Sequence, residues 1–216
     1  MADTGTKPVS IPPGILPSPC SAQHPIRSVC VYCGSSDAVD ERFKTEAYSL
    51  GKIFAENGLR LVYGGGGVGL MGMAARGANE NGGRVIGIMP EFLRSRERLY
   101  DDVETIVVQT MHERKMRLFD EADAFVVLPG GVGTLEEVIE LLSWRRLDLH
   151  KKPIIFLNSG GFWEDFFALV NHTIEKGFTP ASFRHTYMSV DTPEQVLAAI
   201  AEMSCHDENI DTRKVL

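Results

Sequence analysis

The chain of 216 residues lacks any long hydrophobic run, and no stretch approaches the roughly 20 apolar residues that a membrane-spanning helix needs. It also lacks a secretion signal. Residues 1–25 are rich in proline and small side chains, with no charged segment followed by an apolar core. We therefore expect a cytoplasmic protein with no membrane partner, and we expect residues 1–25 to form a disordered tail.

Positive charge is also scarce. The chain has 22 lysines and arginines against 29 aspartates and glutamates, which gives a net charge of −7 at pH 7. This balance argues against a broad surface for a nucleic-acid polymer, but it leaves room for a local cationic pocket. The length and the hydrophobic content of 44% are typical of one soluble domain. We place that domain at residues 26–204 and expect a polar tail over 205–216.

Cysteine is sparse as well, with only Cys20, Cys30, Cys33 and Cys205. Cys30 and Cys33 form a C-x-x-C pair, but no second pair is spaced for a metal site, so we predict no bound metal. A redox pair usually opens a helix, whereas this one lies inside a strand pattern. We interpret both cysteines as small fillers of a buried strand and keep a redox role as the alternative.

Strand patterns and helix patterns alternate along the rest of the chain. Predicted strands occupy 27–33, 59–63, 84–90, 103–110, 123–131, 152–161 and 186–190. Predicted helices occupy 38–57, 71–83, 111–122, 134–147, 162–177 and 192–203. Several strands are continuous apolar runs, which indicates strands that are buried on both faces. We predict a Rossmann-like, doubly wound α/β fold. Its mostly parallel sheet has about seven strands and carries helices on both faces.

Glycines and small hydroxyl side chains gather where the predicted strands end. These ends read CGSS, YGGGGVG, MPE, PGGVGT and NSGG. Ligands of open parallel sheets bind beyond the carboxyl ends of the strands, so this rim is the predicted binding site. Possible nucleotide contacts on two of its loops are Gly34, Ser35, Gly65 and Gly66.

The loop YGGGGVGLMG contains G-x-G-x-x-G through Gly64, Gly66 and Gly69. It follows a predicted strand and precedes a predicted helix, as a dinucleotide fingerprint does. However, the fingerprint normally follows the first strand of its unit, and here it follows the second. Three interpretations stay open: a tight turn with close helix packing, a phosphate contact, or an NAD(P) site of an oxidoreductase.

The segment PGGVGTLEE places two carboxylates directly after a glycine loop. Thr134 and Glu137 have the spacing of a capping box, in which each side chain binds a backbone N–H of the first helical turn. Such a loop before a helix also suits an anion, which nearby carboxylates repel. A second interpretation therefore has the glycines holding a phosphate while one glutamate faces the neighbouring sugar.

The segment MHERKMR supplies the predicted cationic counterpart. Arg114 and Arg117 are three residues apart and share a helix face, while Lys115 points elsewhere. Because this helix follows the fourth predicted strand, its first turn should reach the rim. The alternative is a solvated charged surface.

Together, CVYCGSS, GGGGVGLMG, MHERK and PGGVGTLEE resemble the LONELY GUY (LOG) family in order and spacing, from about Arg27 to Ala201. Members are cytokinin riboside 5′-monophosphate phosphoribohydrolases, and some relatives carry a lysine decarboxylase-like label. The resemblance implies an N-glycosyl hydrolase that converts a nucleoside 5′-monophosphate into a free adenine-type base and ribose 5-phosphate. A nucleotide-binding or sensing protein without catalysis remains the main alternative, and the NAD(P) oxidoreductase is a further one.

The resemblance also assigns residues. It implies that Arg114 and Glu137 are catalytic, that no cofactor is needed, and that the protein is a homodimer. The substrate contacts it implies are Glu97, Lys115, Gly130, Gly131, Val132, Gly133, Thr134, Leu135 and Glu136. Close plant-type relatives read T-W-A-Q-L-G-x-H where this chain reads SWRRLDLH over 143–150. Arg145, Arg146 and Asp148 therefore change the charge near an expected pocket wall or dimer contact.

Overall fold

The computed structural model describes residues 25–94 and 100–211, with side chains up to Cys205. Its centre is a single sheet of seven strands in the order β4-β3-β2-β1-β5-β6-β7, and every neighbouring pair is parallel. The strands are β1 (Ser28–Tyr32), β2 (Arg60–Tyr63), β3 (Val85–Pro90), β4 (Glu104–Val108), β5 (Ala124–Val127), β6 (Ile154–Leu157) and β7 (Met188–Val190). The predicted fold class is confirmed, and the sheet is wholly parallel.

The strand order reverses beside β1. The chain builds β2, β3 and β4 outward on one side of β1, and then returns to build β5, β6 and β7 on the other side. Tyr32 at the end of β1 lies in register with Val127 at the end of β5. At such a reversal the loops after the two central strands turn to opposite faces of the sheet and open a crevice. The reversal therefore predicts a ligand site between the ends of β1 and β5.

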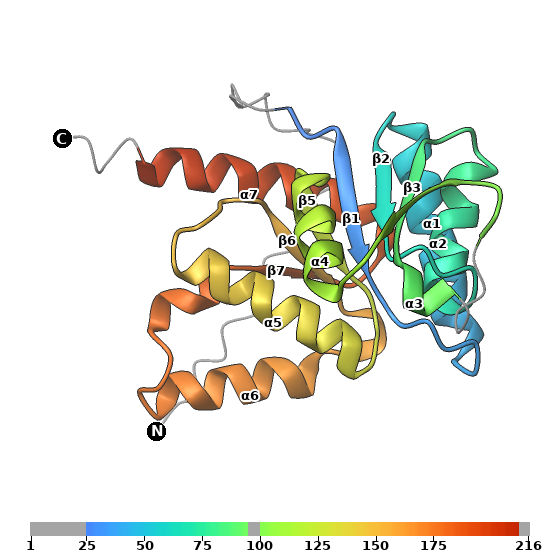
Figure 1. The fold of residues 1–216 in the computed structure, drawn as a ribbon. Coiled ribbons are helices and arrows are strands. Elements are labelled where there is room, and N and C mark those ends of the chain that lie inside the picture. The colour runs from blue at the N-terminus through green and yellow to red at the C-terminus, as the bar shows by residue number, and fades with distance from the viewer. Residues whose placement is uncertain (1–24, 95–99, 212–216) are drawn as a thin grey trace.

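Helices cover both faces of the sheet (Figure 1). The helices are α1 (Glu41–Glu56), α2 (Gly69–Asn79), α3 (Glu91–Arg94), α4 (Met111–Asp120), α5 (Val132–Arg146), α6 (Glu164–Glu175) and α7 (Val196–Asp211). Phe54, Leu70 and Ile200 show that α1, α2 and α7 pack on one face. Leu118 and Val138 belong to the opposite layer, which α4, α5 and α6 share. None of the described helices is long and apolar enough to cross a membrane.

The two faces of the sheet also decide between the two interpretations of the C-x-x-C pair. Successive residues of a strand point to opposite faces, so residues three apart cannot face each other. Cys30 packs in the layer of α4 and α5, while Cys33 packs in the layer of α1 and α2. Both thiols are free and fully buried. The interpretation as strand fillers is confirmed, and a redox pair is excluded by the alternation.

Several helix boundaries differ from the predicted ones by a few residues. Helix α5 begins at Val132 instead of Thr134, so Thr134 is the third residue of the helix and not its cap. Helix α7 continues to Asp211, past the predicted end at Met203. The segment 91–102, which has no clear periodicity, starts with the short helix α3.

Candidate active site

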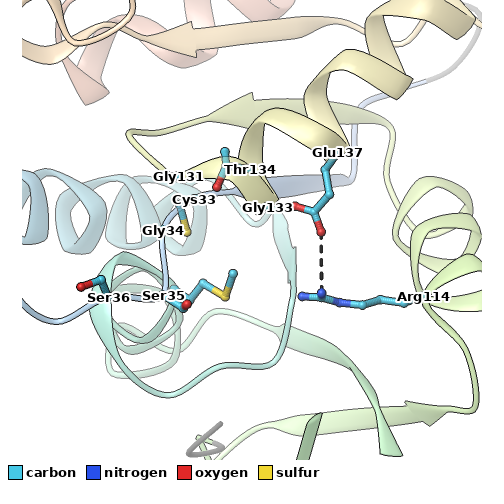
Figure 2. Close-up of a pocket in the computed structure, with 10 residues that line it drawn as sticks. Cys33, Gly34, Ser35, Ser36, Arg114, Gly131, Gly133, Thr134 and Glu137 are labelled. Carbon is cyan, nitrogen blue, oxygen red and sulfur yellow. Dashed lines mark ion pairs between the residues drawn. The ribbon is translucent and has the colours of Figure 1, made fainter. Parts of the chain in front are cut away.

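A cavity of about 270 Å³ lies at the strand-order reversal, between the loops after β1 and β5. Its wall is formed by Cys33, Gly34, Ser35, Ser36, Met71, Arg114, Gly131, Gly133, Thr134 and Glu137. Figure 2 shows these residues converging from segments that are far apart in the sequence. The cavity therefore joins four of the sequence motifs in one place: CGSS, GLMG, MHERK and PGGVGTLEE.

The first turn of α5 opens into this cavity without a side-chain cap. Gly131 is the N-cap in an extended conformation, with φ −93° and ψ −155°, and no side chain accepts a hydrogen bond there. The predicted capping box of Thr134 and Glu137 is therefore wrong. Both residues lie inside the helix, where Thr134 is buried against Gly130. The first N–H groups of a helix have no intrahelical partner, so this terminus can bind an anion.

Gly131 and Gly133 are not explained by the packing of the protein itself. A β-carbon placed on either residue would meet nothing within 4 Å, and neither has a positive φ. Gly130 differs, because a β-carbon there would collide with Thr134. Glycine without a steric or conformational need is typical of places where a ligand approaches the backbone closely.

Arg114 and Glu137 face each other across the cavity. Arg114 Nη1 lies 3.8 Å from Glu137 Oε1, and Figure 2 shows the two side chains pointing toward one another. Only 6% of Arg114 and 7% of Glu137 is exposed to solvent. Burying two charges costs free energy that their attraction often fails to recover, so an ion pair of this kind suggests function more than stability.

The Arg114 side chain is anchored at the ends of two strands. Its Nε donates to the Ile88 carbonyl on β3 and its Nη2 donates to the Gly64 carbonyl directly after β2, each over 3.3 Å. Thr110 is the N-cap of helix α4, which carries Arg114, and its hydroxyl accepts the N–H of Glu113 over 3.1 Å. A guanidinium fixed by carbonyls keeps its charge and its direction.

Comparison with known proteins identifies the family. A family model described as "Possible lysine decarboxylase" matches residues 71–200. The cytokinin riboside 5′-monophosphate phosphoribohydrolase LOG of Oryza sativa subsp. japonica is 40% identical over 82% of this chain and 73% of that protein. A cytokinin riboside 5′-monophosphate phosphoribohydrolase of Arabidopsis thaliana is 37% identical over 84% of this chain and 86% of its own length. The chain belongs to the LOG family.

Solved structures share the fold of this LOG-family chain. The molybdenum cofactor binding protein of the phototrophic bacterium Rippkaea orientalis is 26% identical, with a TM-score of 0.62 over 83% of this chain and 98% of that one. The molybdenum cofactor carrier protein of Chlamydomonas reinhardtii is 22% identical, with a TM-score of 0.61 over the same 83% of this chain and 98% of that chain. These likenesses support the Rossmann-like architecture of the LOG-family chain.

Arg117, the second arginine of the segment MHERKMR, does not reach the cavity. Arg117 is exposed and forms an ion pair of 3.1 Å with Glu121 one helical turn later. The prediction that Arg114 and Arg117 share a functional face is wrong. The inward face of α4 instead carries Arg114 and Leu118, which are four residues apart and both buried.

Four other residues implied by the LOG resemblance lie beside the cavity or on the surface. Lys115 Nζ contacts the Glu136 carboxylate over 2.6 Å and the Glu140 carboxylate over 2.9 Å, linking α4 to α5. Hydrogen bonds to Glu136 and then to Glu140 raise the pKa of Lys115. Val132 is 83% exposed, and Leu135 packs toward the layer under α5. Their contacts with substrate stay predictions, and Glu97 lies outside the described residues.

The glycine fingerprint of the LOG-family chain has mainly local partners. Gly65 has a φ of 84° and lies against Met89, while Gly69 packs on the backbone of Ser35 and Ser36. Gly65 and Gly66 are absent from the described lining of the cavity, so a nucleotide contact there remains a prediction. A dinucleotide site has an acidic residue after the next strand that binds the ribose. Glu91, which follows β3 here, is exposed and paired with Arg94 at 3.2 Å. This geometry favours tight turning and packing over an NAD(P) site.

Sequence reasoning missed Cys33, Ser36 and Met71 as cavity residues. Ser36 stands next to a predicted contact, so the CGSS motif could have identified it. Met71 comes from the first turns of α2, and only the fold brings it to the cavity. Burial raises the pKa of the Cys33 thiol far above its usual range, and the Glu137 carboxylate raises it further. Cys33 is therefore a protonated wall residue and not a nucleophile.

Proposed function

We propose that this LOG-family chain hydrolyses the N-glycosidic bond of cytokinin nucleoside 5′-monophosphates and releases an adenine-type base and ribose 5-phosphate. One observation carries the proposal: the buried pair of Arg114 and Glu137 lies in the same cavity as the uncapped start of α5. Glu137 follows Gly133 by four residues, so both face the cavity from neighbouring turns of one helix. An anion site and a carboxylate are thereby held about one helical turn apart.

The start of α5 suits the 5′-phosphate. The N–H groups of Val132, Gly133 and Thr134 belong to the first turn, where they have no carbonyl partner within the helix. The positive end of the helix dipole adds to their attraction for an anion. Ser35 and Ser36 belong to the same cavity wall. Binding the phosphate away from the reacting bond orients the sugar for reaction.

Glu137 suits the sugar carbon. Cleavage of an N-glycosidic bond develops positive charge at C1′, as glycoside hydrolysis does. A carboxylate beside that carbon stabilises the charge and accepts a proton from the attacking water. An anion site alone does not explain a carboxylate in the same cavity. A role of Glu137 at the neighbouring sugar does explain it.

Arg114 contributes through its charge. A guanidinium does not release its proton at any ordinary pH, so Arg114 is neither the general acid nor the base. Its position 3.8 Å from Glu137 keeps the carboxylate directed into the cavity. Its remaining N–H groups are available for a ribose hydroxyl or for the departing base.

The lysine decarboxylase description of the family model suits this cavity poorly. Decarboxylation with pyridoxal phosphate uses a lysine that forms a Schiff base with the cofactor. No lysine is found among the described residues that line the cavity. Lys115, the nearest lysine in the motif, holds Glu136 and Glu140 outside it.

Incubation of the pure protein with a panel of nucleotides tests the proposal. The panel pairs AMP and an N6-isopentenyl AMP with their dephosphorylated nucleosides, and chromatography measures the free base. We expect free base and ribose 5-phosphate from the monophosphates and much slower release from the nucleosides. Equal rates for both classes would contradict the phosphate anchor. Binding of nucleotides without any release of base would support the non-catalytic alternative.

We also propose that the chain is a homodimer that associates through the helical face of α5 and α6. The supporting observation is a set of exposed apolar side chains on α5, directly after it, and on α6. Ile139 on α5 is 48% exposed, Leu147 and Leu149 after it are 58% and 68% exposed, and Leu169 on α6 is 62% exposed. Apolar groups gathered on one face of a soluble protein are typical of an association surface.

A further inference from the structure

We infer that Gly64 is a positioning residue whose missing side chain makes room for the Arg114 guanidinium. This role rests on the proposed hydrolysis for its effect on turnover, whereas its effect on stability can be measured without any activity. Gly64 follows β2 directly, and the Gly-rich loop that it opens is matched by sequence to a nucleotide fingerprint. The structure gives its first glycine a different task.

The guanidinium of Arg114 is held by two backbone carbonyl groups. Its Nη2 donates to the Gly64 carbonyl and its Nε donates to the Ile88 carbonyl, each over 3.3 Å. The strands β2 and β3 are neighbours, with Tyr63 in register with Gly87, so the two carbonyls belong to adjacent strand ends. Two sheet positions thus fix the direction in which Nη1 approaches Glu137.

Conformation does not explain why position 64 is glycine. Gly65 and Gly69 have φ values of 84° and 60°, which other residues rarely adopt, but Gly64 is not among the residues with positive φ. Space does explain it. A β-carbon on Gly64 would collide with Arg114 Nη2 and would lie 3.3 Å from Met71 Sδ. Position 64 therefore requires glycine because there is no room for a side chain, and not because of its backbone conformation.

The collision has a specific consequence because its partner is the end of a flexible side chain. An alanine at position 64 lets the chain fold, but it displaces the guanidinium from the two carbonyl groups that hold it. Arg114 then loses the Gly64 carbonyl and its approach to Glu137. A displacement of about 1 Å in a catalytic group is enough to lower turnover by up to 10²-fold. Phosphate binding at the start of α5 does not involve Gly64 and stays largely intact.

The experiment compares Gly64→Ala with Gly58→Ala. Gly58 lies in the turn after α1 with a φ of 69°, and a β-carbon there meets nothing within 4 Å. Its replacement costs stability through the backbone alone and serves as the matched control. For Gly64→Ala we expect kcat to fall by about tenfold or more with little change in KM. For Gly58→Ala we expect an unchanged kcat for the folded protein.

A cycle of Tm measurements tests how Arg114 packs against Gly64 without measuring turnover. The same Gly64→Ala change is made in the wild type and in a background that carries Arg114→Ala with Glu137→Gln, which removes both charges together. We expect Tm to fall in the wild type and to stay level or rise in the background, where the space is empty. An equal fall of Tm in the wild type and in the background would contradict the proposed role of Gly64. A kcat of Gly64→Ala equal to that of the wild type would contradict it as well. A wild type that releases no base would contradict the proposed hydrolysis and leave this cycle as an independent measurement.

Discussion

Glu137 combines burial with a cationic partner, and the proposed reaction depends on its negative charge. Its carboxylate lies 3.8 Å from Arg114 and is almost wholly shielded from solvent. In Glu137→Gln the side chain keeps its shape but can neither accept a proton nor stabilise a positive sugar. We expect kcat to fall by about 10²–10⁴-fold, the usual contribution of an acid–base residue. Steady-state release of free base measures this change.

Glu140→Gln provides the matched control for that change. Glu140 lies on the same helix, contacts Lys115 instead of Arg114, and is absent from the cavity wall among the described residues. The same loss of charge there should leave kcat within about threefold of the wild type, because surface pairs contribute less than about 1 kcal/mol. If Glu137→Gln turns over substrate at the rate of Glu140→Gln, Glu137 has only a structural role.

Gly133 offers a test in which stability and binding move in opposite directions. A β-carbon there meets nothing within 4 Å in the free protein, and alanine is the better helix former. Gly133→Ala should therefore raise the free energy of unfolding by about 0.5 kcal/mol. If the phosphate approaches this turn, KM should rise by about tenfold or more through the loss of charge-assisted hydrogen bonds. Thermal unfolding and steady-state kinetics measure the two effects.

An unchanged KM in Gly133→Ala would place the phosphate elsewhere. Gly82→Ala is the comparison variant, because Gly82 also has open space around it but has a φ of 77°. Alanine at that position should lower stability and leave KM unchanged, since Gly82 lies in the turn after α2 and is not part of the cavity wall. The contrast separates ligand approach from general effects of replacing glycine.

Residue roles were predictable here only where a motif carries them. MHERK and PGGVGTLEE located Arg114 and Glu137, and the structure brings both into one cavity. The sequence did not separate Arg114 from Arg117, because spacing alone does not show which side of α4 the sheet covers. Met71 could not be predicted either, since its place in the wall depends on how α2 packs against β2 and β3.

At the scale of the helix, the start of α5 shows how a local rule can fail. Thr134 and Glu137 satisfy the spacing of a capping box, yet Gly131 is the N-cap. Burial of the Thr134 side chain against Gly130 and attraction of Glu137 to Arg114 both compete with capping. These are tertiary contacts, so the sequence alone could not rank them against the local hydrogen bonds.

The segment SWRRLDLH, in which this chain departs from the plant-type LOG sequences, lies at the end of α5. The helix has 15 residues and is about 20 Å long, so its end lies far from the cavity at its start. Arg145 is buried there and donates to the Lys152 carbonyl over 2.9 Å. Arg145 and Asp148 therefore do not line the cavity at the start of α5, and a place at a dimer contact stays a prediction.

Asp148 leads to a prediction about the stability of this helix end. It has a φ of 58°, where plant-type relatives have glycine, and Leu149 N donates to the Trp144 carbonyl over 3.0 Å as in a Schellman motif. A non-glycine residue in this conformation costs about 1 kcal/mol, and glycine relieves that strain at a smaller entropic cost. Asp148→Gly should raise Tm by about 1–2 °C.

Lys176→Gly is the control for that prediction. Lys176 ends α6 with a φ of −82°, a conformation that glycine does not favour over other residues. Glycine there should lower Tm, because it only increases the freedom of the unfolded chain. A fall in Tm for both variants would show that Asp148 makes contacts worth more than its backbone strain.

At the scale of the whole molecule, alternation of strands and helices was enough to predict a doubly wound sheet but not its strand order. A right-handed crossover can add the next strand on either side of the sheet, depending on the face its helix covers. The order β2-β1-β5 is what brings the CGSS and PGGVGT loops together. The site thus depends on a reversal that no single segment encodes.

The association state is the remaining property of the whole molecule, and the helical face of α5 and α6 makes it testable. We expect a mass of twice the 23.8 kDa of one chain by light scattering after size exclusion. Ile139→Arg with Leu169→Arg places two charges on that face, and we expect the doubly changed protein to be a monomer with a Tm close to that of the wild type. Val107→Arg, on the edge strand β4, changes an equally apolar residue that is 39% exposed elsewhere and should leave the dimer intact. A dimer that survives the charges on α5 and α6 but dissociates with Val107→Arg would move the interface to the β4 edge of the sheet, where unpaired backbone groups are available for association.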